Sequence, residues 1–388
     1  MLLSPEKTTV MNTARQHRGG ARAAWLKIHL YLGLFAGALL VLLAVTGSAL
    51  VFGEEIDRFL NPQIVASGAP HVSPDVVVEA VEHHYGRRPY YIETAGGGAY
   101  KAFIEESPGR TDEVRAIWVD PADGRVLTSE PWGGYFSSFM RELHEDLFLG
   151  ETGHYIVGAV SILTLVSILT GLYLWWPRAG ALRKALLFRW SRYPLALNFE
   201  IHRVCGFYLA AVLFVIALAG IYLTFPEPVT SAVGSFSRAT PSPDHVTSAA
   251  PSPGVQPLSV AEVRRVLEEH APGAEVTGYQ MPQTSDEAYA VYYRDPAEPY
   301  SRFGLSTLWI DQYSGEVLAA REYVRSGTAD RYLSSQYMFH NGEILGLPGR
   351  WLVFITGLAI PVMYGTGFYL WWRRRHARQV RASGAKTA

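Results

Sequence analysis

Four long runs of apolar residues divide the chain, at about 30–52, 155–176, 204–225 and 351–372. Each run holds about 22 residues, which in a helix is long enough to cross a hydrocarbon core of ~30 Å. Ionisable side chains are almost absent from the four runs. This pattern predicts an α-helical integral membrane protein with four transmembrane helices.

Lysine and arginine residues near the ends of the runs predict the orientation. The first run is too long for a signal-peptide core, and no small-residue cleavage pattern follows it, so we expect a retained span. Basic residues cluster before the first run, between the second and third, and after the fourth: Arg15, Arg18, Arg22, Lys27; Arg178, Arg183, Lys184, Arg189, Arg192; Arg373, Arg374, Arg375, Arg378. The positive-inside rule places these three segments in the cytoplasm. Segments 53–153 and 226–349 then face the periplasm of a bacterial inner membrane.

The two long segments between spans show strand-like and helix-like patterns of their own. WVDPADGRVL at 118–127 matches WIDQYSGEVL at 309–318, and each joins a strand-like run to a D-x-x-x-G turn signal. Short helical patterns at 76–86 and 260–270 precede them. We therefore expect two small α+β units, the second reached through a Pro/Ser-rich linker at 239–254.

The spans repeat as well. GLYLWW at 171–176 matches GFYLWW at 367–372, and IHLYLG at 28–33 matches IHRVCG at 201–206. Both halves begin on the same side of the membrane, so the chain is a tandem parallel repeat. Such repeats are related by a pseudo-twofold axis along the membrane normal.

Four histidines occupy matching places in this repeat. His29 precedes two glycines by four and eighteen residues, and His202 does the same; His144 and His340 each precede a glycine by 27 residues. Ionisable residues at membrane depth are costly and usually functional. The repeat predicts two facing histidine pairs, His29 with His202 near one face and His144 with His340 near the other.

A facing imidazole pair in an apolar bundle suits haem iron, which accepts two axial histidines. Four histidines could hold two b-type haems, one above the other, and so divide the distance that an electron crosses. The chain has one cysteine, Cys205, so a covalent CxxCH attachment is impossible and thiolates for an iron–sulfur cluster are lacking. Zinc is the competing metal, but the two pairs lie at opposite faces and no HxxxH or HExxH motif occurs.

Several neighbouring residues have two interpretations each. Gly33 and Gly206, four residues after their histidines, could allow close helix packing or make room for a porphyrin face. Three basic residues beside the histidines could contact haem propionates or anchor the spans at the interface: Lys27, Arg203 and Arg350. Aromatic residues before His144 could form a substrate platform or pack the outer unit onto the membrane: Trp132, Tyr135 and Phe136.

The remaining histidines carry weaker signals. His154 enters the second span where the other half has Arg350, so it is an interfacial residue, a propionate contact or a replacement for His144 as ligand. His83 and His84 fall in the outer helical pattern and should be solvated. The others lie in tails or linkers: His17, His71, His245 and His376.

The chain resembles a known bacterial family, the PepSY-associated transmembrane helix proteins, which are iron-regulated inner-membrane proteins. The resemblance rests on IHLYLGLFAG…TGSALVF, LHEDLFLG…TGLYLWWPR, IHRVCGFYL and MFHNGEILG…GFYLWWRR, and it covers about 25–375. The family includes dihaem ferric-siderophore reductases. The resemblance implies that His29, His202, His144 and His340 are the axial ligands of two non-covalent haem b groups.

Together the patterns and the resemblance divide the chain into these segments: 1–24, cytoplasmic; 25–53, first span; 54–143, first periplasmic PepSY-like domain; 144–177, periplasmic histidine segment and second span; 178–198, cytoplasmic loop; 199–225, third span; 226–257, linker; 258–339, second periplasmic PepSY-like domain; 340–373, periplasmic histidine segment and fourth span; 374–388, cytoplasmic tail.

The first functional hypothesis is an oxidoreductase that passes electrons across the membrane to a periplasmic ferric-siderophore. No dinucleotide fingerprint occurs, so the electron donor should be a separate molecule. The alternative is a membrane-anchored regulator or binding protein whose PepSY-like units contact a periplasmic partner without redox activity. A permease is disfavoured because, apart from Pro361, the spans lack buried carboxylates and broken half-helices. The formal charge of −1 gives no sign of a nucleic-acid partner.

Overall fold

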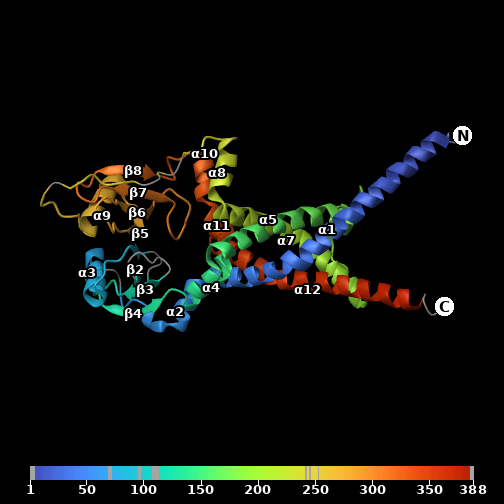
Figure 1. The fold of residues 1–388 in the computed structure, drawn as a ribbon, viewed down its shortest axis with the longest axis horizontal. Coiled ribbons are helices and arrows are strands. Elements are labelled where there is room, and N and C mark those ends of the chain that lie inside the picture. Colours follow the sequence, from blue (N-terminus) through green and yellow to red (C-terminus); the bar gives the residue numbers. More distant parts are fainter. Residues whose placement is uncertain are drawn as a thin grey trace. The chain divides into compact units, whose positions relative to one another are not determined.

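The computed structural model describes residues 5–68, 72–94, 98–106, 113–240, 243, 246–251 and 253–384. His71, His245 and the side chain of His17 lie outside what is described. The chain forms two compact units, which we treat separately (Figure 1). The helical unit comprises Met1–Ser48, Leu143–Phe225 and Trp351–Ala388, and the sheet unit comprises Ala49–Glu142 and Pro226–Arg350.

The helical unit is built on four long helices: α1 (Pro5–Val51), α5 (Gly150–Trp175), α7 (Pro194–Thr224) and α12 (Gly346–Gly384). Each contains a stretch that is long and apolar enough to cross a membrane: Gly20–Val51, Gly150–Trp175, Pro194–Thr224 and Glu343–Val380. The prediction of four membrane helices is therefore confirmed. The helices extend beyond their apolar cores, so much of the segment predicted to precede the first span is itself helical. Two short helices complete this unit, α4 (Phe136–Glu145), which begins in the sheet unit, and α6 (Leu182–Leu186).

Small residues bring these helices into close contact. A Cβ added at Gly158 of α5 would lie 2.6 Å from the Phe225 ring, just after α7. A Cβ at Gly357 of α12 would overlap the Ser48 hydroxyl of α1, and Ser48 donates a 3.1 Å hydrogen bond to the Phe354 carbonyl. Close approach of backbones at small residues is the usual packing mode of helices in a membrane. The α5/α7 and α1/α12 contacts therefore have no room for larger side chains.

The sheet unit contains one eight-stranded antiparallel sheet in the order β4-β3-β2-β1-β5-β6-β7-β8. Its strands are β1 (Tyr91–Glu93), β2 (Tyr100–Glu105), β3 (Val114–Val119), β4 (Val126–Pro131), β5 (Glu275–Gln280), β6 (Tyr289–Arg294), β7 (Ser306–Ile310) and β8 (Val317–Arg321). Each half supplies four strands, and β1 pairs with β5, with Ile92 opposite Tyr279. The two α+β units predicted separately are thus joined edge to edge into one sheet.

The remaining helices of the sheet unit are α2 (Gly53–Leu60), α3 (Pro74–Tyr85), α8 (Pro226–Gly234), α9 (Val260–His270), α10 (Thr328–Ser334) and α11 (Gln336–Asn341), with short 3-10 turns at Pro62–Ile64 and Glu343–Leu345. Helix α8 lies within the segment 226–257 that we predicted as a linker, so the linker is shorter than expected. Both halves of the unit present a helix followed by four strands, α3 with β1–β4 and α9 with β5–β8.

Alternate residues along the strands separate the two faces of the sheet. Ala102 and Ile104 of β2 join the core that α3 and α9 cover, whereas Phe103 points into a second cluster with Trp118 and Tyr135. This is the period of two that a strand imposes. Tyr135 is only 6% exposed and meets Trp118 edge to face, with ring centroids 5.0 Å apart. Its place in this cluster favours packing over a role in a substrate platform.

The D-x-x-x-G turns form as predicted at matching positions of the two halves. The Asp120 carboxylate accepts backbone N–H bonds from Ser67 and Ala122, and the Asp311 carboxylate accepts them from Ala249 and Tyr313. Burial acts to raise the pKa of both carboxyl groups, but the amide donors together outweigh burial and lower it. Each aspartate therefore fixes its turn as an ionised acceptor.

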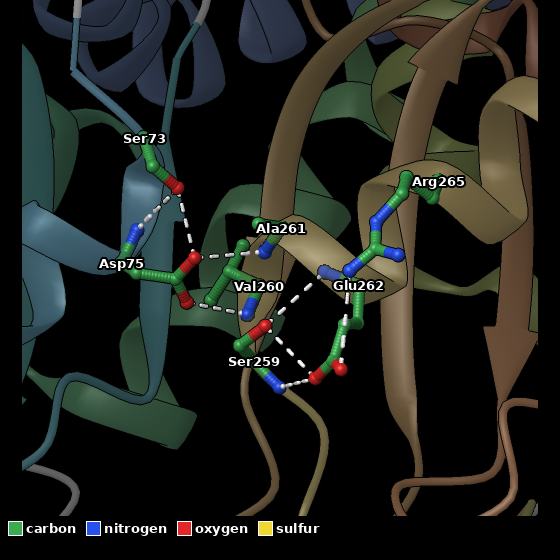
Figure 2. A network of polar contacts seen from close by, with 7 residues as sticks. All are labelled: Ser73, Asp75, Ser259, Val260, Ala261, Glu262 and Arg265. Carbon is green, nitrogen blue, oxygen red and sulfur yellow. Dashed lines mark hydrogen bonds and ion pairs between the residues drawn. The ribbon is translucent and has the colours of Figure 1, made fainter.

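A network of polar contacts joins the starts of α3 and α9 (Figure 2). Ser73 caps α3 by accepting from the Asp75 N–H at 3.3 Å. The Asp75 carboxylate accepts from the backbone N–H groups of Val260 at 2.6 Å and Ala261 at 2.9 Å. A carboxylate at a helix N-terminus satisfies orphan donors and complements the helix dipole. An acid of the first half thus caps a helix of the second half.

Asp75→Ala should lower the unfolding free energy of the chain by about 1–2 kcal/mol, because it leaves two N–H groups of α9 without their acceptor. The measurement is a denaturant titration of the purified full chain in detergent. Glu268→Ala is the matched control, since its 58% exposed side chain forms an ion pair with Arg264 on the same helix. That variant should change stability by less than ~0.5 kcal/mol. Equal effects of the two variants would contradict the capping role of Asp75.

Candidate functional site

His29 of α1 lies against a threonine and a glycine of α5. Its Nδ1 is 3.1 Å from the Ser167 carbonyl oxygen and 3.1 Å from the Thr170 hydroxyl. A Cβ added at Gly171 would lie 3.0 Å from the imidazole Cε1. The ring therefore fills the space that glycine leaves open, next to a hydroxyl that contacts one of its nitrogens. We call such a threonine with its following glycine a Thr–Gly cradle.

His202 of α7 occupies the same kind of place on α12. Its Nδ1 is 3.2 Å from the Met363 carbonyl oxygen and 3.1 Å from the Thr366 hydroxyl. A Cβ at Gly367 would lie 3.2 Å from the ring. The two histidines that the repeat matches are therefore held in the same way by two different helices.

His144, near the end of α4, rests on a third Thr–Gly cradle in α1. The distance from its Nδ1 to the Thr46 hydroxyl is 3.0 Å. A Cβ at Gly47 would lie 2.8 Å from its Cε1, closer than real Cβ contacts allow. His154 of α5, the competing ligand, is half-buried beside Tyr155, with ring centroids 6.2 Å apart. The shared cradle favours His144 over His154 as a site residue.

The carbonyl contacts of His29 and His202 indicate which nitrogen of these two rings carries a proton, because a carbonyl oxygen only accepts. The threonines Thr46, Thr170 and Thr366 each donate their own proton to a carbonyl of their helix at 2.9 Å. The Thr170 and Thr366 hydroxyl oxygens therefore accept from His29 and His202, whose Nδ1–H groups are the donors. A neutral imidazole that donates from Nδ1 keeps a free lone pair on Nε2. Metal-ligating histidines commonly have a hydrogen-bond partner on their second nitrogen, which fixes the tautomer in this way.

The structure brings His29 and His202 together. Their ring centroids are 6.3 Å apart, and the ring planes are inclined by 75°. Two coaxial imidazoles that each place a nitrogen about 2.0 Å from one metal ion, as histidine does on zinc, have ring centres about 6 Å apart. The pair therefore offers two neutral nitrogen donors at a separation that fits the two axial positions of a haem iron.

The glycines that follow these histidines behave differently from each other. A Cβ at Gly33 would meet no described atom within 4 Å, so Gly33 does not mark a close helix contact. A Cβ at Gly206 would lie 3.1 Å from the Met363 methyl group. Gly206 therefore fits the interpretation of close helix packing, whereas the open space at Gly33 leaves room for a flat group.

The two arginines considered as propionate contacts have other partners. Arg203 donates to the Glu200 carboxylate at 2.7 Å and to the Leu187 carbonyl at 2.9 Å. Arg350 donates to the Val51 carbonyl at 2.5 Å and to the Glu55 carboxylate at 2.7 Å. These bonds favour anchoring roles for both arginines. Lys27 is exposed.

The two histidines of the second predicted pair lie in different units. His144 belongs to the helical unit, and His340, half-buried on α11, belongs to the sheet unit. Their pairing therefore stays a prediction. His83 and His84 are exposed on α3, in line with solvated side chains, and His376 stacks on Trp372 with ring centroids 6.1 Å apart. Across the described ranges, no three His, Cys, Asp or Glu side chains form a metal-ligating group.

The sequence interpretation missed the threonines. It used Gly47, Gly171 and Gly367 only to align the repeats, although a threonine precedes each of them. A Thr–Gly step at a fixed spacing from a histidine was the available signal. This spacing could not show which histidine each threonine contacts, because the contacts of His29 and His202 are made between two different spans.

Four candidate membrane helices and an eight-stranded antiparallel sheet define a polytopic membrane protein with a folded sheet unit. The chain belongs to the family described as the PepSY-associated TM region, which matches residues 26–374 and so most of the chain. A search of curated proteins found no significant match.

Proposed function

We propose that this protein carries electrons across a bacterial inner membrane through two bis-histidine haem b groups and reduces a ferric-siderophore at the periplasmic face. The observation that carries the proposal is the His29–His202 pair, with ring centroids 6.3 Å apart. Both rings donate from Nδ1 to their cradles, which leaves Nε2 of each free to bind iron. His144 and His340 are the proposed second pair.

The chain's own residues hold and separate the two sites. A haem b held by such a pair would supply a one-electron carrier, and its iron would keep both histidines when it is reduced or oxidised. The Thr–Gly cradles orient the rings, and the apolar helices keep water and lipid headgroups from the metal-binding positions. No general base or nucleophile is required for outer-sphere electron transfer.

The proposed topology follows the basic residues that flank the spans. Arg178 after α5 and Arg374 in the C-terminal part of α12 support a cytoplasmic location for these helix ends, and the basic residues before the first span support the same location for the N-terminus. The sheet unit then lies in the periplasm. A pseudo-twofold axis along the membrane normal would relate the two halves, so His29 and His202 would face each other across it.

The proposed substrate reaction is a one-electron reduction of Fe(III) to Fe(II) in the siderophore complex. A separate donor on the cytoplasmic side supplies the electron, and the iron accepts it at the other face. Fe(II) is a poorer match than Fe(III) for hard oxygen donors, so reduction weakens the complex and releases iron. This assigns the protein to haem-dependent oxidoreductases that act in iron uptake.

The test uses purified protein reduced with dithionite and freed of excess reductant. Adding a ferric hydroxamate together with an Fe(II)-specific chelator should oxidise the protein and form the coloured Fe(II) chelate in the same time course. His144→Ala protein should form the chelate at least tenfold more slowly, since it lacks a ligand of the proposed haem site at the periplasmic face. Equal rates for the two proteins would reject the electron path. Colourless protein from haem-replete cells would favour the alternative, a PepSY-containing regulator.

A further inference from the structure

The two tryptophans that end the GLYLWW motif have no role in the proposed ligand set, and they differ from each other. Trp176 is 72% exposed, which suits an indole at a membrane interface. Trp175 is only partly exposed, and its Nε1 is buried without a hydrogen-bond partner among the described residues. An indole N–H can only donate, and a buried donor without an acceptor is costly. We therefore expect this N–H to have an acceptor that the described residues do not supply.

Trp175 lies one helical turn from the contact between α5 and His29. It follows Gly171, which the His29 ring contacts, by four residues, so both residues lie on one face of α5, about 6 Å apart along the helix axis. Its indole stacks on the Phe207 ring of α7, with centroids 4.0 Å apart and planes inclined by 20°. Phe207 follows His202 by five residues on that helix. The stack holds the indole between the helices that contribute to the His29–His202 site.

The matching tryptophan of the second half shows that the motif alone does not create an unpaired N–H. Trp371 follows its cradle on α12 as Trp175 follows its cradle on α5, but its nitrogen is not one of the buried, unpartnered atoms of the described residues. Its ring packs against Phe368 of its own helix, with centroids 5.3 Å apart. The first half has Leu34 at the place that matches Phe207, so the aromatic partner of Trp175 is specific to one side of the repeat.

The chemistry of the site indicates which acceptor suits the Trp175 N–H. Lipid headgroups do not reach a nitrogen that is buried in the protein. The propionate carboxylates of a haem b are its hydrogen-bond acceptors, and bonds to an ionised acceptor are about twice as strong as neutral ones. Arg203 and Arg350, the arginines considered for the propionates, have protein partners. A propionate would therefore pair with a donor that is otherwise unsatisfied.

We propose that the Trp175 indole N–H binds the carboxylate of a haem propionate at the His29–His202 site. This inference rests on the proposed function, and it adds to the site a residue that is not an axial ligand. The hydrogen bond holds the haem by its charged edge and leaves the iron to the two histidines. Loss of the N–H should weaken haem retention without changing the low-spin, bis-histidine spectrum.

The test measures the rate at which purified His144→Ala protein, which should keep the His29–His202 site alone, loses haem to an excess of apomyoglobin. Replacing Trp175 with benzothienylalanine, which keeps the fused rings but lacks the N–H, should speed the loss about 10–100-fold, as expected for a hydrogen bond to a charged group. The same replacement at Trp176 is the matched control and should leave the rate unchanged. Equal rates for the two replacements would overturn the inference, because the N–H would then bond only to a trapped water.

A second variant and the spectrum complete the test. Trp175→Phe keeps an aromatic ring against Phe207 and should lose haem as fast as the benzothienylalanine protein, with a low-spin spectrum in both. A high-spin spectrum in both would overturn the inference, since the indole would then act on the axial histidines. Should His144→Ala protein contain no haem, or two haems, the proposed function fails and this inference with it. Should it contain one haem that leaves at the same rate with and without the Trp175 N–H, only the present inference fails.

Discussion

His29→Ala should reduce the bound haem from about two groups per chain to about one, with the low-spin spectrum of the remaining haem preserved. The His29 ring is one of two imidazoles whose centroids lie 6.3 Å apart. Alanine supplies no nitrogen donor, and His202 alone offers a single axial ligand. The measurement is a haem assay of purified protein together with its visible spectrum.

His144→Ala should give the complementary result, with loss of the other haem and retention of the first. His83→Ala is the control, because His83 is exposed on α3 and should leave both haems in place. Retention of both haems in His29→Ala and in His144→Ala would remove the ligand assignment.

Gly367→Val should be almost as damaging to the His29–His202 site as removal of a ligand. A Cβ at this position would already lie 3.2 Å from His202 Cε1, and the two further methyl groups of valine would push the imidazole off the Thr366 hydroxyl. We expect loss of most of the haem from this site, or its conversion to a weakly bound, high-spin form. Haem content and the visible spectrum report both outcomes.

Gly365→Val provides a closely matched control for this substitution. It lies two residues away on the same helix, and a Cβ there would meet no described atom within 4 Å. It carries the same change in helix propensity and hydrophobicity. We expect it to keep the wild-type haem content, and a loss equal to that of Gly367→Val would mean that the cradle does not act through His202.

The sequence was sufficient for the features that depend on local pattern. Apolar runs of span length gave the four membrane helices, and the D-x-x-x-G steps at Asp120 and Asp311 gave the two hairpin turns. The equivalence of His29 and His202 led us to expect facing rings, and the structure places them side by side. Each of these features depends on residue types at fixed spacings, which a single sequence displays.

Features that depend on contacts between distant segments were not readable. The β1–β5 pairing joins one edge strand of each half, and edge pairing is made by backbone groups that every sequence carries. The Asp75 cap on α9 connects residues 185 positions apart. Thr170 was hidden because a threonine in a span usually bonds its own helix, and only the structure shows its second bond to His29.

The haem content of the purified protein gives the most direct test of the account. Wild-type protein, purified from cells supplied with haem, should contain about two haem b per chain by pyridine haemochrome assay and show a low-spin, bis-histidine spectrum. A colourless protein, or one whose haem is high-spin and unchanged by His29→Ala, would contradict the central claim that paired imidazoles of the two halves bind iron porphyrin.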